Sequence, residues 1–249
     1  MGSSRCPWRF AMLTNSHPLL STMFSRDFLG ASECADTLSR VNRLWDRWTM
    51  RGGYGFCTLG AASYLDAAES RDTYLAAAAR TNPILSDVFG DIYSGLRVFL
   101  QDVLGDPVTY DERLALPGFH IFQFDGTEVA DEMLAERAHF DLQFLLAVPQ
   151  WTPEATLSFT LPLGLPSGGG SLAVWPVRHE EILGYDQPAR DIAAQSRCEI
   201  VDYEIGRMVL HDGFLLHAIG APSVTAPYGQ RITLQGHGVR RQGRWTIYW

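Results

Sequence analysis

The sequence predicts a mostly β fold with N-terminal helices, in which a double-stranded β-helix, or jelly roll, is packed by α-helices. Two observations lead to this fold class. Apolar residues recur at helical spacing through residues 32–104, whereas short β-type runs separated by Gly and Pro clusters begin at Pro117. The strands are not interleaved with helices, which disfavours a doubly wound parallel sheet and favours a sandwich or barrel.

Three helical segments are expected in the N-terminal part. The first has Ser32 as a plausible N-cap and Gly52-Gly53 as its stop. The second is rich in alanine and ends before Asn82-Pro83, and the third runs from there to Gly105. Apolar stripes of this kind are most often core packing.

About eight strands are expected in the remainder of the chain, and no linker divides it. We therefore interpret residues 1–249 as a single domain, with 1–116 as mainly helical support and 117–249 as a cupin-like jelly-roll core. The predicted strands are "GFHIFQF", "FDLQFLLAV", "TLSFTLPL", "SLAVWP", "CEIVDYEI", "RMVLHDGFLLHAIG", "QRITLQGHGVRR" and "RWTIYW".

Composition excludes several classes of partner. The net charge is -8 and no basic run of five residues occurs, so nucleic acid is a poor candidate. No apolar run has the roughly 18 residues of a membrane span, and the N-terminus has no apolar core of a secretory signal. The four cysteines form no C-x-x-C pair and are typical of a reducing compartment, so we expect a cytoplasmic protein.

A candidate metal-binding pair lies in the run "AHFDLQF". On a strand, side chains alternate between faces, so His139 and Asp141 point the same way with Gln143 beside them. One imidazole and one carboxylate two residues apart suit adjacent positions on a metal, and a second histidine completes the face typical of non-haem Fe(II). Gln143 is a possible supporting residue.

The H-x-[DE] pattern alone is weak, because composition predicts about one chance match in this chain. A second match, His179-Glu180-Glu181, lies in a charged stretch without alternation and is interpreted as a solvated loop. The match at His139 lies in a half-buried strand pattern, where ligands would have rigid support.

Two residues are candidates for the second histidine. Asp212-Gly213 is a hairpin signal between two apolar runs, which places His211 at the edge of the turn and His217 inside the next strand. An isolated histidine in an apolar strand is more often a core residue than a ligand. His217 is favoured because an arginine on a polar strand face lies a short distance downstream.

Arg231 comes fourteen residues after His217 and shares a predicted strand face with Thr233, Gln235 and His237. A buried arginine needs a carboxylate or phosphate partner, because an unpaired buried charge is very costly. A polar face with arginine at its head suits a small dianion, and Thr233 can add a hydroxyl.

The order H-x-D, a long gap, His and then Arg resembles the Fe(II)/2-oxoglutarate-dependent dioxygenases. The matching pieces "PGFHIF", "HFD", "GGGSLAVWP", "GRMVLHDGFLLHAIG" and "QRITLQGH" span about half the chain. The resemblance implies that His139, Asp141 and His217 ligate Fe(II) and that Arg231 pairs with the distal carboxylate of the co-substrate 2-oxoglutarate. It also implies molecular oxygen as the other co-substrate.

A looser resemblance connects "GGYGFCTLGAASYLDA", "LALPGFHIF" and "HFDLQ" to small oxygenases that modify free amino acids and similar metabolites. That branch includes halogenases, in which Gly replaces the metal-binding carboxylate and a halide takes the position. Because this chain keeps Asp141, the resemblance implies hydroxylation of an aliphatic C–H in a small soluble substrate.

Several alternatives stay open on the sequence alone. The same oxidative chemistry gives desaturation, cyclisation or epoxidation with the same ligands. A non-oxidative metal-binding jelly roll and a zinc hydrolase are rivals, both weakened by Arg231. His120 and Gln123 lie on opposite faces of "GFHIFQF", and the pattern does not decide which faces the site. The substrate's identity and the oligomeric state are likewise undecided.

Overall fold

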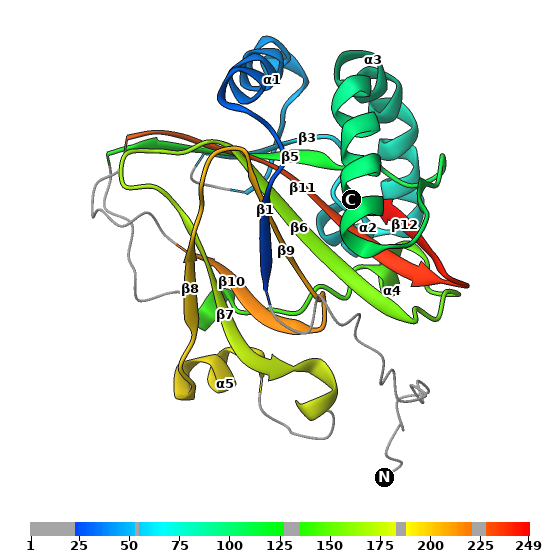
Figure 1. Cartoon of the computed structure of the whole chain (residues 1–249), viewed down its shortest axis with the longest axis vertical. Helices are drawn as coiled ribbons and strands as arrows, with labels where there is room; N and C mark the ends of the chain where they lie inside the picture. The colour runs from blue at the N-terminus through cyan, green and yellow to red at the C-terminus, as the bar shows by residue number, and fades with distance from the viewer. Residues whose placement is uncertain (1–22, 53–54, 127–134, 183–187, 221–227) are drawn as a thin grey trace.

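Two β-sheets and two long helices dominate the computed structural model, which describes residues 23–52, 55–126, 135–182, 188–220 and 228–249 (Figure 1). The predicted mostly β fold with helices near the N-terminus is therefore confirmed. The first 116 residues, expected to be mainly helical, also contain four short strands that join the larger sheet. The single-domain interpretation stays a prediction.

The larger sheet has the strand order β1-β9-β6-β11-β5-β3-β2. At its edge β12 pairs antiparallel with β11 and parallel with β4. The long strand β11 lies between β6 and β5 and carries Arg231 and His237. The strands are β1 Phe24–Asp27, β2 Thr49–Met50, β3 Phe56–Leu59, β4 Val108–Tyr110, β5 Gly118–Asp125, β6 Ala155–Gly164, β9 Arg207–His211, β11 Tyr228–Arg241 and β12 Arg244–Tyr248.

The smaller sheet has the order β10-β7-β8 and consists of β7 Ser171–Arg178, β8 Glu199–Asp202 and β10 Leu215–Gly220. From β6 onward the chain alternates between the sheets: β6 is in the larger, β7 and β8 in the smaller, β9 in the larger, β10 in the smaller and β11 in the larger. Asp212-Gly213 is therefore not a hairpin turn as predicted, because β9 and β10 belong to different sheets and pair with different strands.

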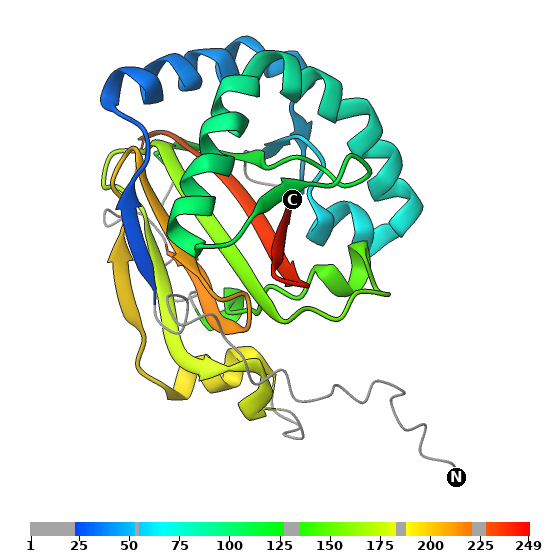
Figure 2. The same ribbon diagram turned by 45° about the vertical axis from the view of Figure 1, so that its right-hand side comes forward.

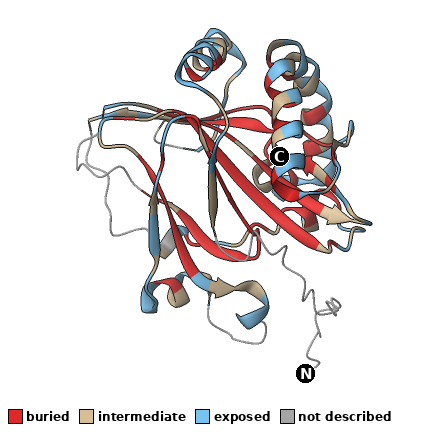
Figure 3. Ribbon diagram, in the orientation of Figure 1, coloured by how far each residue is buried: buried red, intermediate tan, exposed pale blue. Residues whose placement is uncertain are grey.

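The helices α1 Ala31–Arg43 and α3 Arg71–Leu104 lie against one face of the larger sheet (Figure 2). Buried residues of both helices share one apolar cluster with residues of β5, β6 and β11. Figure 3 shows buried residues on the sheet-facing sides of these helices. The shorter helices are α2 Ser63–Glu69, α4 Phe144–Ala147 and α5 Ala189–Gln195, and Trp45–Arg47, Ala135–Arg137 and His179–Ile182 are 3-10 turns.

The helix limits differ from the predicted ones in three places. The N-cap of α1 is Gly30 rather than Ser32, and its backbone N–H donates to the Glu33 carboxylate at 2.8 Å. α1 ends at Arg43, well before Gly52. α3 continues through Pro83, because buried residues on both sides of the proline pack against the rest of the protein. The predicted end of the third segment at Gly105 is confirmed, with φ +71°.

The predicted strand "FDLQFLLAV" is wrong. Only His139 makes a strand-like bridge, to His217, and residues 140–142 are irregular before α4 begins at Phe144. Since the side chains do not alternate here, Phe140 and Leu142 line the same cavity as Asp141 instead of facing the opposite side.

None of the helices in the described part of the chain combines the length and the hydrophobicity needed to cross a bilayer.

Candidate metal centre

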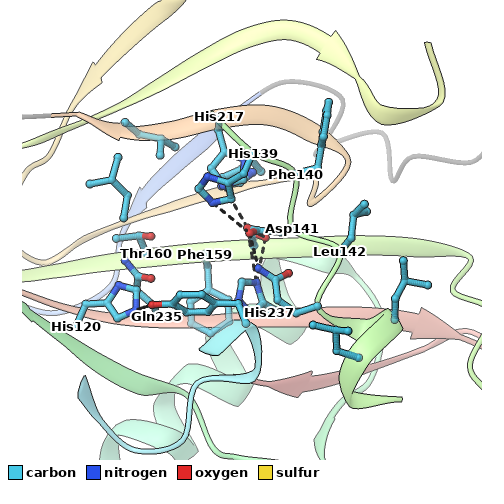
Figure 4. Close-up of a pocket in the computed structure, with 18 of the residues that line it drawn as sticks. His120, His139, Phe140, Asp141, Leu142, Phe159, Thr160, His217, Gln235 and His237 are labelled. Carbon is cyan, nitrogen blue, oxygen red and sulfur yellow. Dashed lines mark hydrogen bonds and ion pairs between the residues drawn. The ribbon is translucent and has the colours of Figure 1, made fainter. Parts of the chain in front are cut away.

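His139, Asp141 and His217 come together, and their ligand atoms all lie within 4.8 Å of one another (Figure 4). Asp141 Oδ1 is 3.6 Å from His139 Nε2, and Asp141 Oδ2 is 3.3 Å from His217 Nε2. Backbone hydrogen bonds in both directions join His139 to His217, at 2.9 and 3.1 Å. The structure thus unites three residues that the sequence singles out.

Both histidines present the nitrogen that suits a metal. Nδ1 of His139 donates to the Arg137 carbonyl at 2.7 Å, and Nδ1 of His217 donates to the Leu215 carbonyl at 2.8 Å. With the proton held on Nδ1, each Nε2 carries a free lone pair directed at the Asp141 side. The His139 side chain is 48% exposed and His217 is buried, so His139 lies on the open side of the site.

The Asp141 carboxylate is buried and held at both oxygens. Gln143 Nε2 donates to Oδ1 at 2.7 Å, and the Ser158 hydroxyl donates to Oδ2 at 2.5 Å. Burial acts to raise the pKa of Asp141, but the neighbouring His217 and His237 hold it well below the usual value. Asp141 is therefore an ionised acceptor with a fixed orientation. The hydrogen bond from Gln143 to Asp141 is consistent with the predicted supporting role of Gln143.

Sequence reasoning missed Ser158, although a signal was present. Thr156, Ser158 and Thr160 alternate with apolar residues along β6, which marks a polar strand face. Ser158 Oγ also lies 3.3 Å from Nδ1 of His237, whose ring is 3.7 Å from Asp141. His237 therefore lies beside the candidate ligand set.

The crossing from β9 to β10 positions the centre. Asp212 is buried, binds Arg178 at 2.7 Å and accepts from Thr156 at 2.5 Å. The next residue, Gly213, accepts the backbone N–H of Asp141 at 2.8 Å. A Cβ at Gly213 would meet the Asp141 carbonyl oxygen at 3.0 Å, so glycine allows the ligand segment to approach this closely.

Replacing Gly213 with alanine should lower metal affinity by about tenfold, the lower end of the effect of changes outside the ligand set. The reason is displacement of Asp141, which the new methyl group contacts. Titration of the apo-protein with Co(II), followed by its visible absorption, measures the effect. Gly90→Ala is the control, because a Cβ there meets nothing within 4 Å. Equal affinity in Gly213→Ala and the parent would contradict the prediction.

A cavity of about 670 Å³ opens around the three residues and is lined from both sheets. His120 lines it and is buried, whereas Gln123 is exposed, which decides the question that the strand pattern left open. Burial, together with nearby Arg231, lowers the pKa of His120 to about 3, so its ring is neutral. Its Nε2 lies 2.6 Å from the Tyr64 hydroxyl.

Arg231 is buried and lies just behind the residues that line the cavity. Its guanidinium is 4.3 Å from the ring centroid of Phe122, which lines the cavity, and Nη1 donates to the Gly220 carbonyl at 3.1 Å. Burial lowers the pKa of Arg231 to about 10, so it is charged at neutral pH. Among the described residues no carboxylate forms an ion pair with it, which leaves a buried cation ready for an anion.

Tyr203, which the sequence analysis did not single out, flanks the same position. A Cβ at Gly170 would contact Tyr203 at 3.4 Å and Arg231 at 3.5 Å, so both side chains lie against this glycine. The Tyr203 hydroxyl is buried near the Thr160 side chain, and no described residue gives it a hydrogen bond of ordinary geometry. Burial raises its pKa to about 12, so it is a neutral donor. It lies just after β8, within the predicted run "CEIVDYEI", and nothing in that run marks Tyr203 as a site residue.

The remaining candidates take other positions. Thr233 is buried and its hydroxyl accepts from Gln235 at 3.2 Å, so its contact with a co-substrate stays a prediction. His211 packs its ring 4.3 Å from that of His217 and donates from Nδ1 to the Asp212 carbonyl. It is not part of the convergent set. His179 lies on a short turn between the rings of Phe140 and Phe214.

The donor set fits Fe(II). Two imidazole nitrogens and one carboxylate on one face, opening to a cavity, match the arrangement that leaves coordination positions free for exogenous ligands. Hydrogen bonds from outside the set orient each donor, as is usual for metal ligands in proteins.

Comparison with solved structures identifies the fold. An N-substituted L-amino acid dioxygenase from Burkholderia ambifaria AMMD, solved with α-ketoglutarate, is 14% identical with a TM-score of 0.54, over 93% of this chain and 89% of that chain. AviO1 from Streptomyces viridochromogenes Tue57 is 14% identical with a TM-score of 0.50, over 89% and 90% of the chains. The predicted resemblance to dioxygenases that bind 2-oxoglutarate is thus confirmed at the level of the fold. No protein-family model matches the sequence, and no curated protein matches it either.

Proposed function

We propose that this protein is an Fe(II)- and 2-oxoglutarate-dependent oxygenase that hydroxylates an aliphatic C–H bond of a small molecule. The observation that carries the proposal is the convergence of His139, Asp141 and His217 within 4.8 Å at a cavity, beside which the buried, charged Arg231 stacks on the lining residue Phe122. Bound Fe(II), with 2-oxoglutarate and molecular oxygen, supplies the oxidising chemistry.

The chain's own residues have separate tasks in this proposal. Nε2 of His139, Nε2 of His217 and one Asp141 oxygen hold the metal. Arg231 pairs with the distal carboxylate of 2-oxoglutarate, where a charge-assisted, two-pronged contact gives orientation as well as affinity. Its stacking on Phe122 and its bond to Gly220 fix the guanidinium before the co-substrate arrives.

We also infer that the two sheets form a double-stranded β-helix, which the alternation of β6 to β11 between the sheets supports. A cytoplasmic location and a small-molecule substrate are parts of the same proposal.

The direct test is conversion of 2-oxoglutarate to succinate. Purified protein loaded with Fe(II) should form succinate only when oxygen and 2-oxoglutarate are both present, and a metal chelator should stop it. Mass spectrometry of a metabolite panel should then find a product that has gained one oxygen atom. A protein that binds Fe(II) but never consumes 2-oxoglutarate would contradict the proposal and favour a non-oxidative metal-binding protein.

Tyr203→Phe should weaken 2-oxoglutarate binding by about two- to tenfold, because it removes one neutral hydrogen-bond donor beside Arg231. The change keeps the ring and its packing, so the fold and metal affinity should be unaffected. Calorimetric titration of the Co(II)-loaded protein with 2-oxoglutarate gives the comparison. Tyr228→Phe is the matched control, since Tyr228 is 64% exposed. Equal affinities for all three proteins would show that Tyr203 does not contact the co-substrate.

A further inference from the structure

The cavity has two ends of different character, with the candidate metal centre between them. Figure 4 shows His120 and Leu142 on opposite sides of Asp141. On the His120 side, β5 pairs with β11 so that His120 lies opposite Thr233 and Phe122 opposite Arg231. If the proposed function holds, the co-substrate occupies this side, and the substrate must occupy the other.

The substrate side is built by residues 140–146. Because this segment is not a strand, Phe140, Leu142, Leu145 and Leu146 all reach the cavity. Leu146 is 42% exposed, so this side of the cavity meets solvent, whereas Arg231, which stacks on Phe122 on the other side, is 5% exposed. An aliphatic wall at the open end provides contact for the apolar body of a substrate.

Gln143 adds one polar group to this wall, and its orientation is set by Asp141. A metal-binding carboxylate is ionised and can only accept hydrogen bonds, so the Gln143 amide must turn its NH₂ group toward Oδ1, at 2.7 Å. The amide oxygen, Oε1, is then buried without a hydrogen-bond partner among the described residues, although Gln143 lines the cavity. A buried acceptor left unsatisfied is costly, which favours a donor supplied by a ligand.

We propose that residues 140–146 recognise the substrate, with Gln143 Oε1 accepting a hydrogen bond from an uncharged N–H or O–H group. The substrate is then a neutral, largely apolar molecule whose donor lies next to the carbon that reacts, because Gln143 directly contacts the metal-binding Asp141. A charged group placed deep against this wall, away from the solvent-exposed Leu146, would be buried against leucine and phenylalanine side chains, which is unfavourable. This substrate class rests on the proposed function and excludes a free amino acid bound through its charges.

The test compares matched probes on the Co(II)-loaded protein with 2-oxoglutarate bound, where no oxidation interferes. N-Cyclohexylbutanamide carries the donor, its N-methyl derivative lacks it, and free leucine carries two charges. Calorimetry should show the amide binding roughly five- to tenfold more tightly than the N-methyl derivative, the effect of one hydrogen bond. Leucine should bind more weakly than either amide.

Gln143→Met keeps the side-chain length but removes the amide oxygen, so the preference for the N–H probe should disappear. Ser158→Ala is the control, because it removes the other donor to Asp141 and leaves residues 140–146 intact, and it should keep the preference. The proposal would be overturned if the parent protein bound the two amides equally or bound neither of them. It would also be overturned if the preference for the N–H probe survived in Gln143→Met. Failure of the parent protein to bind Co(II) or 2-oxoglutarate would instead count against the proposed function.

Discussion

Asp141→Gly should lose Fe(II) affinity by more than the roughly 10- to 100-fold expected for loss of a supporting residue. Asp141 supplies the only carboxylate oxygen of the convergent set, and both its oxygens are oriented by hydrogen bonds. The remaining pair, His139 and His217, would hold the ion through two nitrogens. Titration with Fe(II) without oxygen, together with circular dichroism to confirm the fold, measures the change. Ser158→Ala should show a smaller loss of affinity.

The same variant tests why hydroxylation is proposed instead of halogenation. In the proposed function, Asp141 and the two histidines would hold the metal and leave three positions for 2-oxoglutarate and oxygen, with none for a halide. Products from the parent protein should therefore be oxygenated at any chloride or bromide concentration. The metal in Asp141→Gly would have a fourth open position. We therefore expect halogenated product in the residual turnover of this variant. Mass spectrometry of the products distinguishes oxygenated from halogenated molecules. Halogenated product from the parent protein would refute the assignment of Asp141 as the ligand that leaves no position for a halide.

Arg231→Met should weaken 2-oxoglutarate binding by roughly 10- to 100-fold while metal affinity stays unchanged. The substitution removes a buried charge-assisted contact, of about 1.5–3 kcal/mol, and keeps most of the buried volume. Calorimetric titration of the Co(II)-loaded variant with 2-oxoglutarate gives the affinity. A rise in the concentration of 2-oxoglutarate needed for half-maximal succinate formation should accompany it.

Arg137 provides the control for this result. It is exposed, and its charge lies near enough to Arg231 to lower the pKa of that residue further. If Arg231 is the residue that holds the co-substrate, Arg137→Met should leave 2-oxoglutarate affinity within about twofold, as for most surface substitutions. Unchanged affinity in Arg231→Met with a large loss in Arg137→Met would reassign the role.

Local patterns in the sequence predicted most of the β elements. Seven of the eight predicted runs contain strands of the structure, because alternation of apolar and polar residues is visible within a single strand. The exception is "FDLQFLLAV", which has the pattern of a strand but bends after His139 and continues into α4. The backbone here bonds to Gly213 and His217, residues more than 70 positions away, and no local pattern encodes those contacts.

The sequence by itself determined the chemistry that is available: a histidine and a carboxylate two residues apart, a second histidine, and an arginine that a buried strand cannot leave unpaired. These choices depend on residue type and short spacing. Tertiary structure alone decided that His120 rather than Gln123 enters the cavity, that Ser158 and His237 adjoin Asp141, and that Tyr203 lies near Arg231. Those placements depend on how distant strands pair and on which sheet each one joins, since a shift of one residue in register turns every side chain to the opposite face.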